Sequence, residues 1–251
     1  MSSPEARRAY RQRAEEAMRT VLRYDQETEK EGWELKQVTE GPDGPIRAYT
    51  KLFSGLACLK SYGHVDAASR AIFRLICDYP RRSELDPNYQ SITVLEQIDE
   101  QVAVTHSKFA AMLGGLISSR DFVAVAFQAE ADGALLIAAT GVEHLLPATK
   151  GRRFPALLTS RIQNPERISG YVRGETFPSA WIIRPEGENR SRVTYIAHAN
   201  IKGMIPTGLI NRALASTAAT FYQRAHALLA SAPVRPPPEE QDQQPQSGTG
   251  K

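Results

Sequence analysis

The sequence has little cysteine, little net charge and no long apolar run. Its two cysteines, Cys58 and Cys77, lie far apart in a chain of 251 residues, so neither a disulfide framework nor a zinc site is indicated. The formal net charge of +3 is too small to argue for a nucleic-acid partner. No segment approaches the roughly 18 apolar residues of a membrane-spanning helix. These absences predict a reduced protein with no metal site.

Motifs of exported proteins, of hydrolases with a nucleophile elbow and of metal sites are also missing. The N-terminus is too polar for a secretory signal, and Glu5, Glu15 and Glu16 disfavour a transit peptide. No nucleophile elbow is present, and the histidines do not have the spacing of metal ligands. We therefore expect a cytoplasmic protein that uses no cofactor.

What the sequence does contain is a helical pattern at each end with strand patterns between. Residues 4–31 predict a helix that begins at Pro4 and stops at Gly32. Asp66 is placed to cap a second helix over residues 67–77. Period-2 patterns predict strands at 33–38, 46–52, 58–65, 92–98, 102–107, 122–129, 135–142, 169–173, 180–184 and 192–201.

The last helix, from Pro206 to about Ser231, organises the rest of the chain. Its apolar positions form one continuous stripe at helical spacing: Ile210, Leu214, Thr217, Phe221, Ala225 and Leu228. Such a stripe needs an apolar partner, and the concave side of a sheet is the obvious one. We therefore predict one α+β domain, residues 32–231, with 1–31 as its N-terminal helix. Residues 232–251 are rich in Pro and Gln and predict a disordered tail.

Two motifs resemble a known family. Residues 118–123 read Ser-Ser-Arg-Asp-Phe-Val at the start of a strand, and this resembles the Arg-Asp-Phe/Tyr-Val element of START domains, the lipid transfer family. Residues 201–206, Ile-Lys-Gly-Met-Ile-Pro, resemble the family's junction between last strand and last helix. The likeness spans about residues 31–230. It implies the helix-grip fold, a curved antiparallel β-sheet around a long C-terminal helix, with a hydrophobic tunnel for one lipid.

The resemblance also exposes a departure. In sterol-carrying members an acidic residue and an arginine face each other in the tunnel, and by position these correspond to Ser107 and Ala126 here. Neither is charged. The family favours a wall made of Ala103, Thr105, Ser107, Phe122, Ala124 and Ala126. The opposite parity (Val102, Val104, His106, Val123, Val125 and Phe127) would be an ordinary core. Because no inward-facing arginine is evident, a neutral lipid such as a sterol is favoured over phosphocholine lipids.

The candidate ligand-binding residues are Thr105, Ser107, Phe122, Ala124, Ala126, Trp181, His198, Met204, Ile205, Leu209, Leu214 and Phe221. Trp181 fits a core position equally well, and His198 is better explained as a hydrogen-bonded structural residue than as a ligand contact. Arg120 and Asp121 are interpreted as a local hydrogen-bonded pair, not as catalytic groups.

The segment 145–167 combines basic and apolar residues, and in the family this loop flanks the tunnel mouth. Contact with an anionic bilayer during lipid exchange and a merely solvated loop explain it equally well. We expect a monomeric lipid carrier gated by this loop and the last helix, with Gly203 and Gly208 as hinges and transient membrane contact. The alternatives are a carrier or sensor of phospholipid or another lipid and, less favoured, a helix-grip cyclase or hydrolase.

Overall fold

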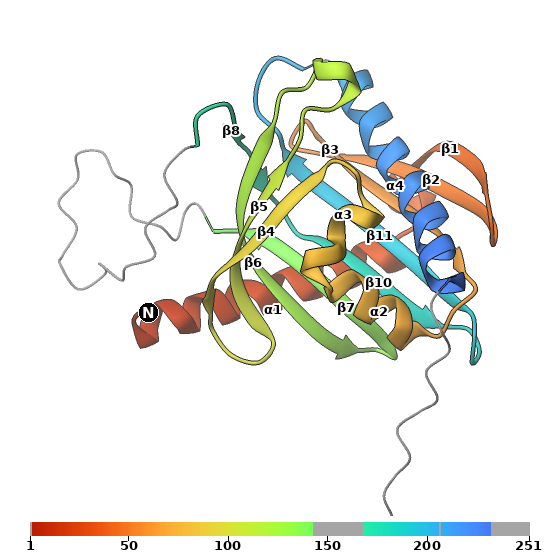
Figure 1. The fold of residues 1–251 in the computed structure, drawn as a ribbon, viewed down its shortest axis with the longest axis horizontal. Coiled ribbons are helices and arrows are strands. Elements are labelled where there is room, and N and C mark those ends of the chain that lie inside the picture. The colour runs from red at the N-terminus through yellow and green to blue at the C-terminus, as the bar shows by residue number, and fades with distance from the viewer. Residues whose placement is uncertain (1, 143–167, 206, 232–251) are drawn as a thin grey trace, which may run out of the picture.

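A curved antiparallel sheet forms the centre of the molecule, with a long helix on each face (Figure 1). The computed structural model describes residues 2–142, 168–205 and 207–231. The predicted gating loop 145–167 and the tail 232–251 therefore lie outside the described residues. In Figure 1, α1 (Pro4–Gln26) passes behind the strands and α4 (Thr207–Ala230) lies in front of them. The predicted helix-grip arrangement is confirmed.

The described strands pair in the order β1-β2-β3-β11-β10-β7-β6-β5-β4, and neighbours along this path are antiparallel. Short strand β8 runs parallel to β6, and β9 pairs with β11. The bounds are β1 Glu34–Gly41, β2 Gly44–Phe53, β3 Leu56–Val65, β4 Tyr89–Gln97, β5 Val102–Phe109, β6 Arg120–Ala131, β7 Ala134–Gly141, β8 Val172–Arg173, β9 Glu175–Thr176, β10 Ser179–Pro185 and β11 Ser191–Asn200.

Two of the hairpins turn on residue pairs with positive φ. Ser54 and Gly55 have φ of 49° and 83°, and Asp132 and Gly133 have φ of 50° and 70°. Left-handed conformations at both central residues match the right-handed twist of the flanking strands. The turn residues therefore fix the register in which β2 meets β3 and β6 meets β7.

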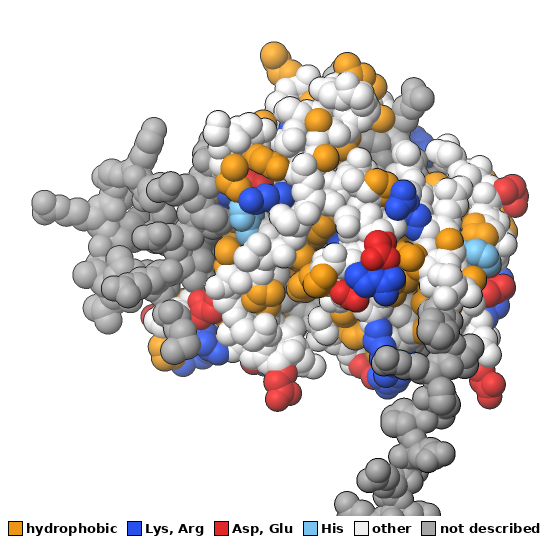
Figure 2. Space-filling view, viewed as in Figure 1, with side chains coloured by type: hydrophobic (Ala, Val, Ile, Leu, Met, Phe, Trp, Pro, Cys, Tyr) orange, Lys and Arg blue, Asp and Glu red, His pale blue; other side chains and the backbone are white. Residues whose placement is uncertain are grey.

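Two short helices, α2 (Ser69–Cys77) and α3 (Arg82–Leu85), connect β3 to β4. The predicted cap at Asp66 is wrong: α2 has Ala68 as its N-cap, without a side-chain hydrogen bond. The Ala67 amide donates to the Val65 carbonyl at 2.8 Å, and this tight turn delays the helix. Asp66 instead pairs with Arg190. In Figure 2, basic and acidic side chains lie together over the region of α2 and α3.

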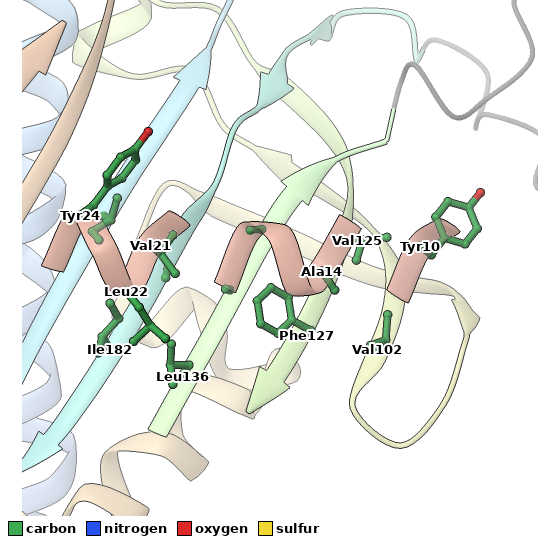
Figure 3. Packing of buried hydrophobic residues seen from close by; sticks show 14 of the residues in the cluster. Tyr10, Ala14, Val21, Leu22, Tyr24, Val102, Val125, Phe127, Leu136 and Ile182 are labelled. Carbon is green, nitrogen blue, oxygen red and sulfur yellow. The ribbon is translucent and has the colours of Figure 1, made fainter. Parts of the chain in front are cut away.

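Helix α1 buries one side against the sheet. Ser3 caps it by accepting a hydrogen bond from the Ala6 amide at 3.2 Å. Figure 3 shows Val21 and Leu22 of α1 beside Leu136 and Ile182 of the strands. The predicted end at residue 31 is wrong, because Thr28 starts a separate 3₁₀ turn (Glu29–Glu31) with its own capping box.

Helix α4 is held at its C-terminal half by buried polar contacts. The Tyr222 hydroxyl donates to the Val193 carbonyl at 2.8 Å. The His226 Nδ1 atom lies 2.7 Å from a carboxylate oxygen of Asp43 in the β1–β2 turn. Phe221 and Ala225 pack into the same buried cluster as Ile183. These contacts fix α4 across the concave face of the sheet and leave space beneath it.

Candidate ligand-binding cavity

A cavity of about 260 Å³ lies between the concave face of the sheet, α4 and the α2–α3 connection. This is close to the lower end of the range for ligand pockets, about 300 Å³. Its wall includes Thr105, Ser107 and Phe109 of β5, Phe122, Ala124 and Ala126 of β6, Ile137 and Ala139 of β7, Trp181 of β10, Tyr195, Ala197 and Ala199 of β11, and Thr217 and Phe221 of α4.

Strand alternation decides which side chains reach this cavity. Thr105 lies opposite Ala124, and Ser107 lies opposite Phe122, all four in the wall. The residues of the other parity on the same strands, Val102, Val104, Val123, Val125 and Phe127, belong to the core beneath α1. Successive side chains point to opposite faces of a sheet. The cavity therefore exists where β5, β6, β7 and β11 present small side chains on one face.

The hydroxyl groups of the β5 wall residues already have protein partners. The Tyr89 hydroxyl donates to the Ser107 Oγ at 3.2 Å. The Thr105 hydroxyl donates to the Ala124 carbonyl at 3.4 Å. Ser107 keeps its own proton for a second bond, because a hydroxyl can donate once while it accepts. Ser107 and Tyr89 thus form a compact polar group in an otherwise apolar wall.

An aromatic cluster closes the end of the cavity nearest α3. The Trp181 ring stacks on Tyr195, with centroids 4.0 Å apart, and lies 3.9 Å from Phe221. The guanidinium carbon of Arg82 lies 5.6 Å from the ring centroids of both Tyr89 and Trp181. The sequence prediction that no arginine faces inward is therefore wrong. Arg82 was missed because it lies in a connector without periodicity, and only the chain path brings it to the wall.

Arg120 also lies in the wall, but its donors are used by the protein. It donates to the Ile201 carbonyl at 2.6 Å and to the Lys202 carbonyl at 3.3 Å, at the junction that leads into α4. Burial lowers the pKa of this guanidinium. Arg120 thus connects the start of β6 to the end of β11, and its N–H groups are used in these hydrogen bonds.

Asp121 lies on the opposite face, so the predicted pairing with Arg120 is wrong. Its carboxylate contacts Arg173 Nη2 at 2.6 Å and His106 Nε2 at 2.8 Å. Burial by itself would raise the pKa of Asp121, but the hydrogen bonds from Arg173 and His106 outweigh it and lower that pKa. Adjacent residues of a strand cannot pair across the sheet, because their side chains leave opposite faces.

His198 borders the cavity, but its ring packs between two phenylalanines. The centroids of Phe53 and Phe177 lie 5.3 and 4.7 Å from it. Neither ring nitrogen has a hydrogen-bond partner among the described residues, so the predicted hydrogen-bonded histidine is wrong. Burial lowers the pKa of His198 to about 4, and the ring is neutral at pH 7.

The remaining predicted ligand contacts lie at the start of α4. Met204 is fully exposed and does not line the described cavity wall. Ile205 and Leu209 are half-buried and also outside that wall. The side chain of Leu214 lies outside the described part of the chain. Phe221 lines the cavity, one helical turn after Thr217. That any of the predicted residues contacts ligand stays a prediction.

Tyr195, Ala197 and Ala199 line the cavity although the sequence analysis did not select them. They alternate along β11, and the period-2 rule that selected Thr105 and Ser107 on β5 could have found them. Tyr79 and Arg82 carried no comparable signal, since they precede β4 in an irregular connection.

A larger hollow of about 810 Å³ lies elsewhere, at the C-terminal end of α1. Two of its carboxylates form ion pairs: Asp25 with Arg184 at 3.0 Å, and Glu27 with the neighbouring Lys51 at 2.8 Å. Lys60 donates to the Tyr24 carbonyl at 2.9 Å. Although it is larger, this hollow is lined mainly by charged and polar side chains, and the apolar cavity under α4 is the better candidate for a lipid.

Within the described ranges, no helix is long and apolar enough to cross a membrane. The same residues contain no group of three or more side chains that could hold a metal ion. The cavity wall is therefore built from apolar, aromatic and hydrogen-bonding groups, with Arg82, Arg120 and Asp86 as its described charged side chains.

Comparison with known proteins agrees with this architecture. The START domain family model matches residues 12–233, nearly the whole chain. This protein therefore belongs to the START domain family.

Individual relatives are distant. Steroidogenic acute regulatory protein of Xenopus laevis is 23% identical over 227 residues, which cover 89% of this chain and 72% of that protein. The mitochondrial steroidogenic acute regulatory protein of Rattus norvegicus is 24% identical over 230 residues, covering 90% and 73%. Human StAR-related lipid transfer protein 5 superposes with a TM-score of 0.70 at 21% identity, covering 88% of this chain and 97% of that one. At this identity the superposition shows the shared fold alone.

Proposed function

We propose that this protein is a monomeric, non-catalytic carrier that holds one lipid with a sterol-sized apolar body in the cavity under α4. The observation that carries the proposal is the wall itself, where Ala124, Ala126, Ala139, Ala197 and Ala199 leave space beneath a long helix. The names of the relatives, a steroidogenic regulatory protein and a lipid transfer protein, support the ligand class.

Hydrophobic burial supplies the binding free energy. A sterol that loses about 500 Å² of apolar surface to the cavity gains on the order of 12 kcal/mol before the costs of association. Ser107, hydrogen-bonded to Tyr89, offers one hydroxyl donor to the polar end of such a ligand. Dry walls therefore set the affinity and a few polar groups set the orientation.

A carrier is favoured over an enzyme by the positions of the ionisable groups. Two His–Asp pairs are described: His106 and Asp121 lie on the face opposite the cavity, and neither His226 nor Asp43 is part of the described cavity wall. General acid–base catalysis requires such a pair within hydrogen-bonding reach of the ligand. Both cysteines are unpaired, and this supports a reducing, cytoplasmic location.

We also propose that residues 1–31 and 32–231 form one folding unit. Tyr10, Ala14 and Val21 of α1 are buried in the same cluster as the sheet residues Val104 and Val125. Lipid exchange then requires movement at the α4 junction and the 145–167 segment, not separation of domains.

The direct test is titration of the purified protein with a fluorescent sterol and, in parallel, with a fluorescent phosphatidylcholine. Saturable one-to-one sterol binding, displaced by unlabelled sterol, supports the proposal. Tight phosphatidylcholine binding without sterol binding would keep the carrier function and reject the sterol. Binding of neither, with chemical conversion of an added small molecule, would reject the carrier function.

A further inference from the structure

Arg82, one of the two basic side chains of the described cavity wall, has no acidic partner among the described residues. Arg82 is half-buried, and its Nη1 atom donates to the Ile76 carbonyl at 3.0 Å. Its neighbour Arg81 is exposed and forms an ion pair with Glu84 at 2.7 Å. Two adjacent arginines thus have different environments: one is paired at the surface and the other faces the cavity.

The aromatic rings around Arg82 form a cage that the protein fills itself. The guanidinium carbon lies 5.6 Å from the ring centroids of Tyr89 and Trp181, and Trp181 is backed by Tyr195 and Phe221. Cages of this kind bind quaternary ammonium groups. Here Arg82 occupies the position that a cationic head group would take. A choline group is therefore excluded from this end of the cavity by both space and charge.

Donors remain for a ligand of the opposite charge. A guanidinium carries five N–H groups, and the hydrogen bond of Arg82 to Ile76 uses one of them. The Tyr195 hydroxyl forms no hydrogen bond with a described residue and lies in the same wall. Burial raises the pKa of Tyr195, so its hydroxyl stays protonated and can donate.

The charges of the described wall also favour an anionic ligand. It contains Arg82 and Arg120 but one carboxylate, Asp86. Asp86 Oδ1 already accepts hydrogen bonds from the Asn88 amide and side chain, at 2.9 and 3.1 Å. Arg120 gives its donors to backbone carbonyls. Arg82 is left as the cation that can bind a ligand in a low-dielectric site, where such a bond is strong.

We propose that Arg82 binds an anionic oxygen group of the ligand, a carboxylate, sulfate or phosphate monoester, and that the protein prefers acidic amphiphiles to neutral or choline-bearing lipids. This inference rests on the proposed carrier function and specifies its ligand. The acidic group could belong to a steroid or to a fatty chain. A planar guanidinium suits such groups because it donates two parallel hydrogen bonds.

The test compares two ligands with the same ring system, cholesterol and cholesterol sulfate, by competition with a fluorescent sterol. The wild-type protein should bind the sulfate on the order of 10- to 100-fold more tightly, the range of a hydrogen-bonded charge. Arg82→Met should abolish that preference, because Met can keep the contact with the rings but has no charge and no N–H donor. Arg82→Lys should retain part of the preference. The matched control, Arg81→Met, should behave as wild type.

Each outcome decides the inference. Equal wild-type affinity for the two sterols overturns it, whether or not the variants fold. A preference that survives in Arg82→Met also overturns it. Oleate binding that depends on Arg82 supports the anionic chemistry and assigns the apolar body to a fatty chain. Binding of cholesterol or phosphatidylcholine, but of no acidic amphiphile, rejects the inference and leaves the carrier function intact. Binding of no lipid rejects both.

Discussion

The two faces of strands β5, β6 and β7 share one backbone, but one face is close-packed and the other borders a cavity. On the α1 face, Val104, Val125 and Leu136 are fully buried and close-packed. On the α4 face, Thr105 and Ala124 are buried too, yet they border a cavity of about 260 Å³. Branched side chains fill the space between helix and sheet, whereas small ones leave it empty. Binding capacity is thus set by side-chain volume on alternate residues.

The largest expected effect is a difference in stability between alanine variants of two neighbouring residues of β7. Leu136→Ala should lower the free energy of unfolding by about 4 kcal/mol, because Leu136 is fully buried beneath α1 and the surrounding side chains cannot close the hole that the truncation leaves. Ile137→Ala should cost about 1 kcal/mol, since Ile137 borders space that is already empty. Urea unfolding of both variants measures the difference. Equal losses would show that the two faces are packed alike.

The next effect concerns acid. His198 has a pKa lowered by burial from 6.5 to about 4, so the unfolded chain takes up the proton first as pH falls. Stability that is present above pH 6.5 should therefore decrease by about 3 kcal/mol between pH 6.5 and 4. His198→Phe should remove this dependence, since the ring would keep its contacts with Phe53 and Phe177. Parallel pH profiles for the two proteins would contradict the assignment.

A smaller effect is expected at the junction between sheet and α4. Arg120→Met leaves the carbonyls of Ile201 and Lys202 without their donor and should cost about 2 kcal/mol. It should also speed lipid exchange between vesicles, because these contacts hold the chain that leads into α4. Unfolding and vesicle-transfer rates are the measurements. Unchanged transfer at reduced stability would limit Arg120 to a structural role.

The smallest effect on stability should accompany a large effect on binding. Ala124→Leu places a larger side chain in the cavity and so reduces its volume. It should change the free energy of unfolding by less than about 1 kcal/mol, yet weaken lipid binding at least tenfold. Val125→Leu, one residue further on the packed face, should destabilise by about 1–3 kcal/mol and leave binding intact. Thermal melting and sterol titration of the pair test this. A reversed pattern would exchange the roles of the two faces.

Much of this could be read from residue patterns. Period-2 alternation separates Thr105 and Ser107 from Val104 and His106, and the two motifs at 118–123 and 201–206 indicate the family that the comparison established. Two wrong predictions concern helix ends, where neighbouring turns and hydrogen bonds changed what the local pattern predicted. The end of α1 depended on Thr28 starting a separate turn. Asp66 was placed as a cap, but a hydrogen bond between Ala67 and Val65 shifted the start of α2.

The sequence by itself determined the elements, the apolar faces and the small residues that make a cavity possible, because these follow from local spacing and side-chain volume. The tertiary structure alone decided that Arg82 lies among Tyr89, Trp181 and Tyr195, and that Arg120 and Asp121 serve opposite faces. Contacts between residues distant in the chain depend on strand order and on where an irregular connector crosses the sheet. Neither is encoded in the periodicity of any single segment.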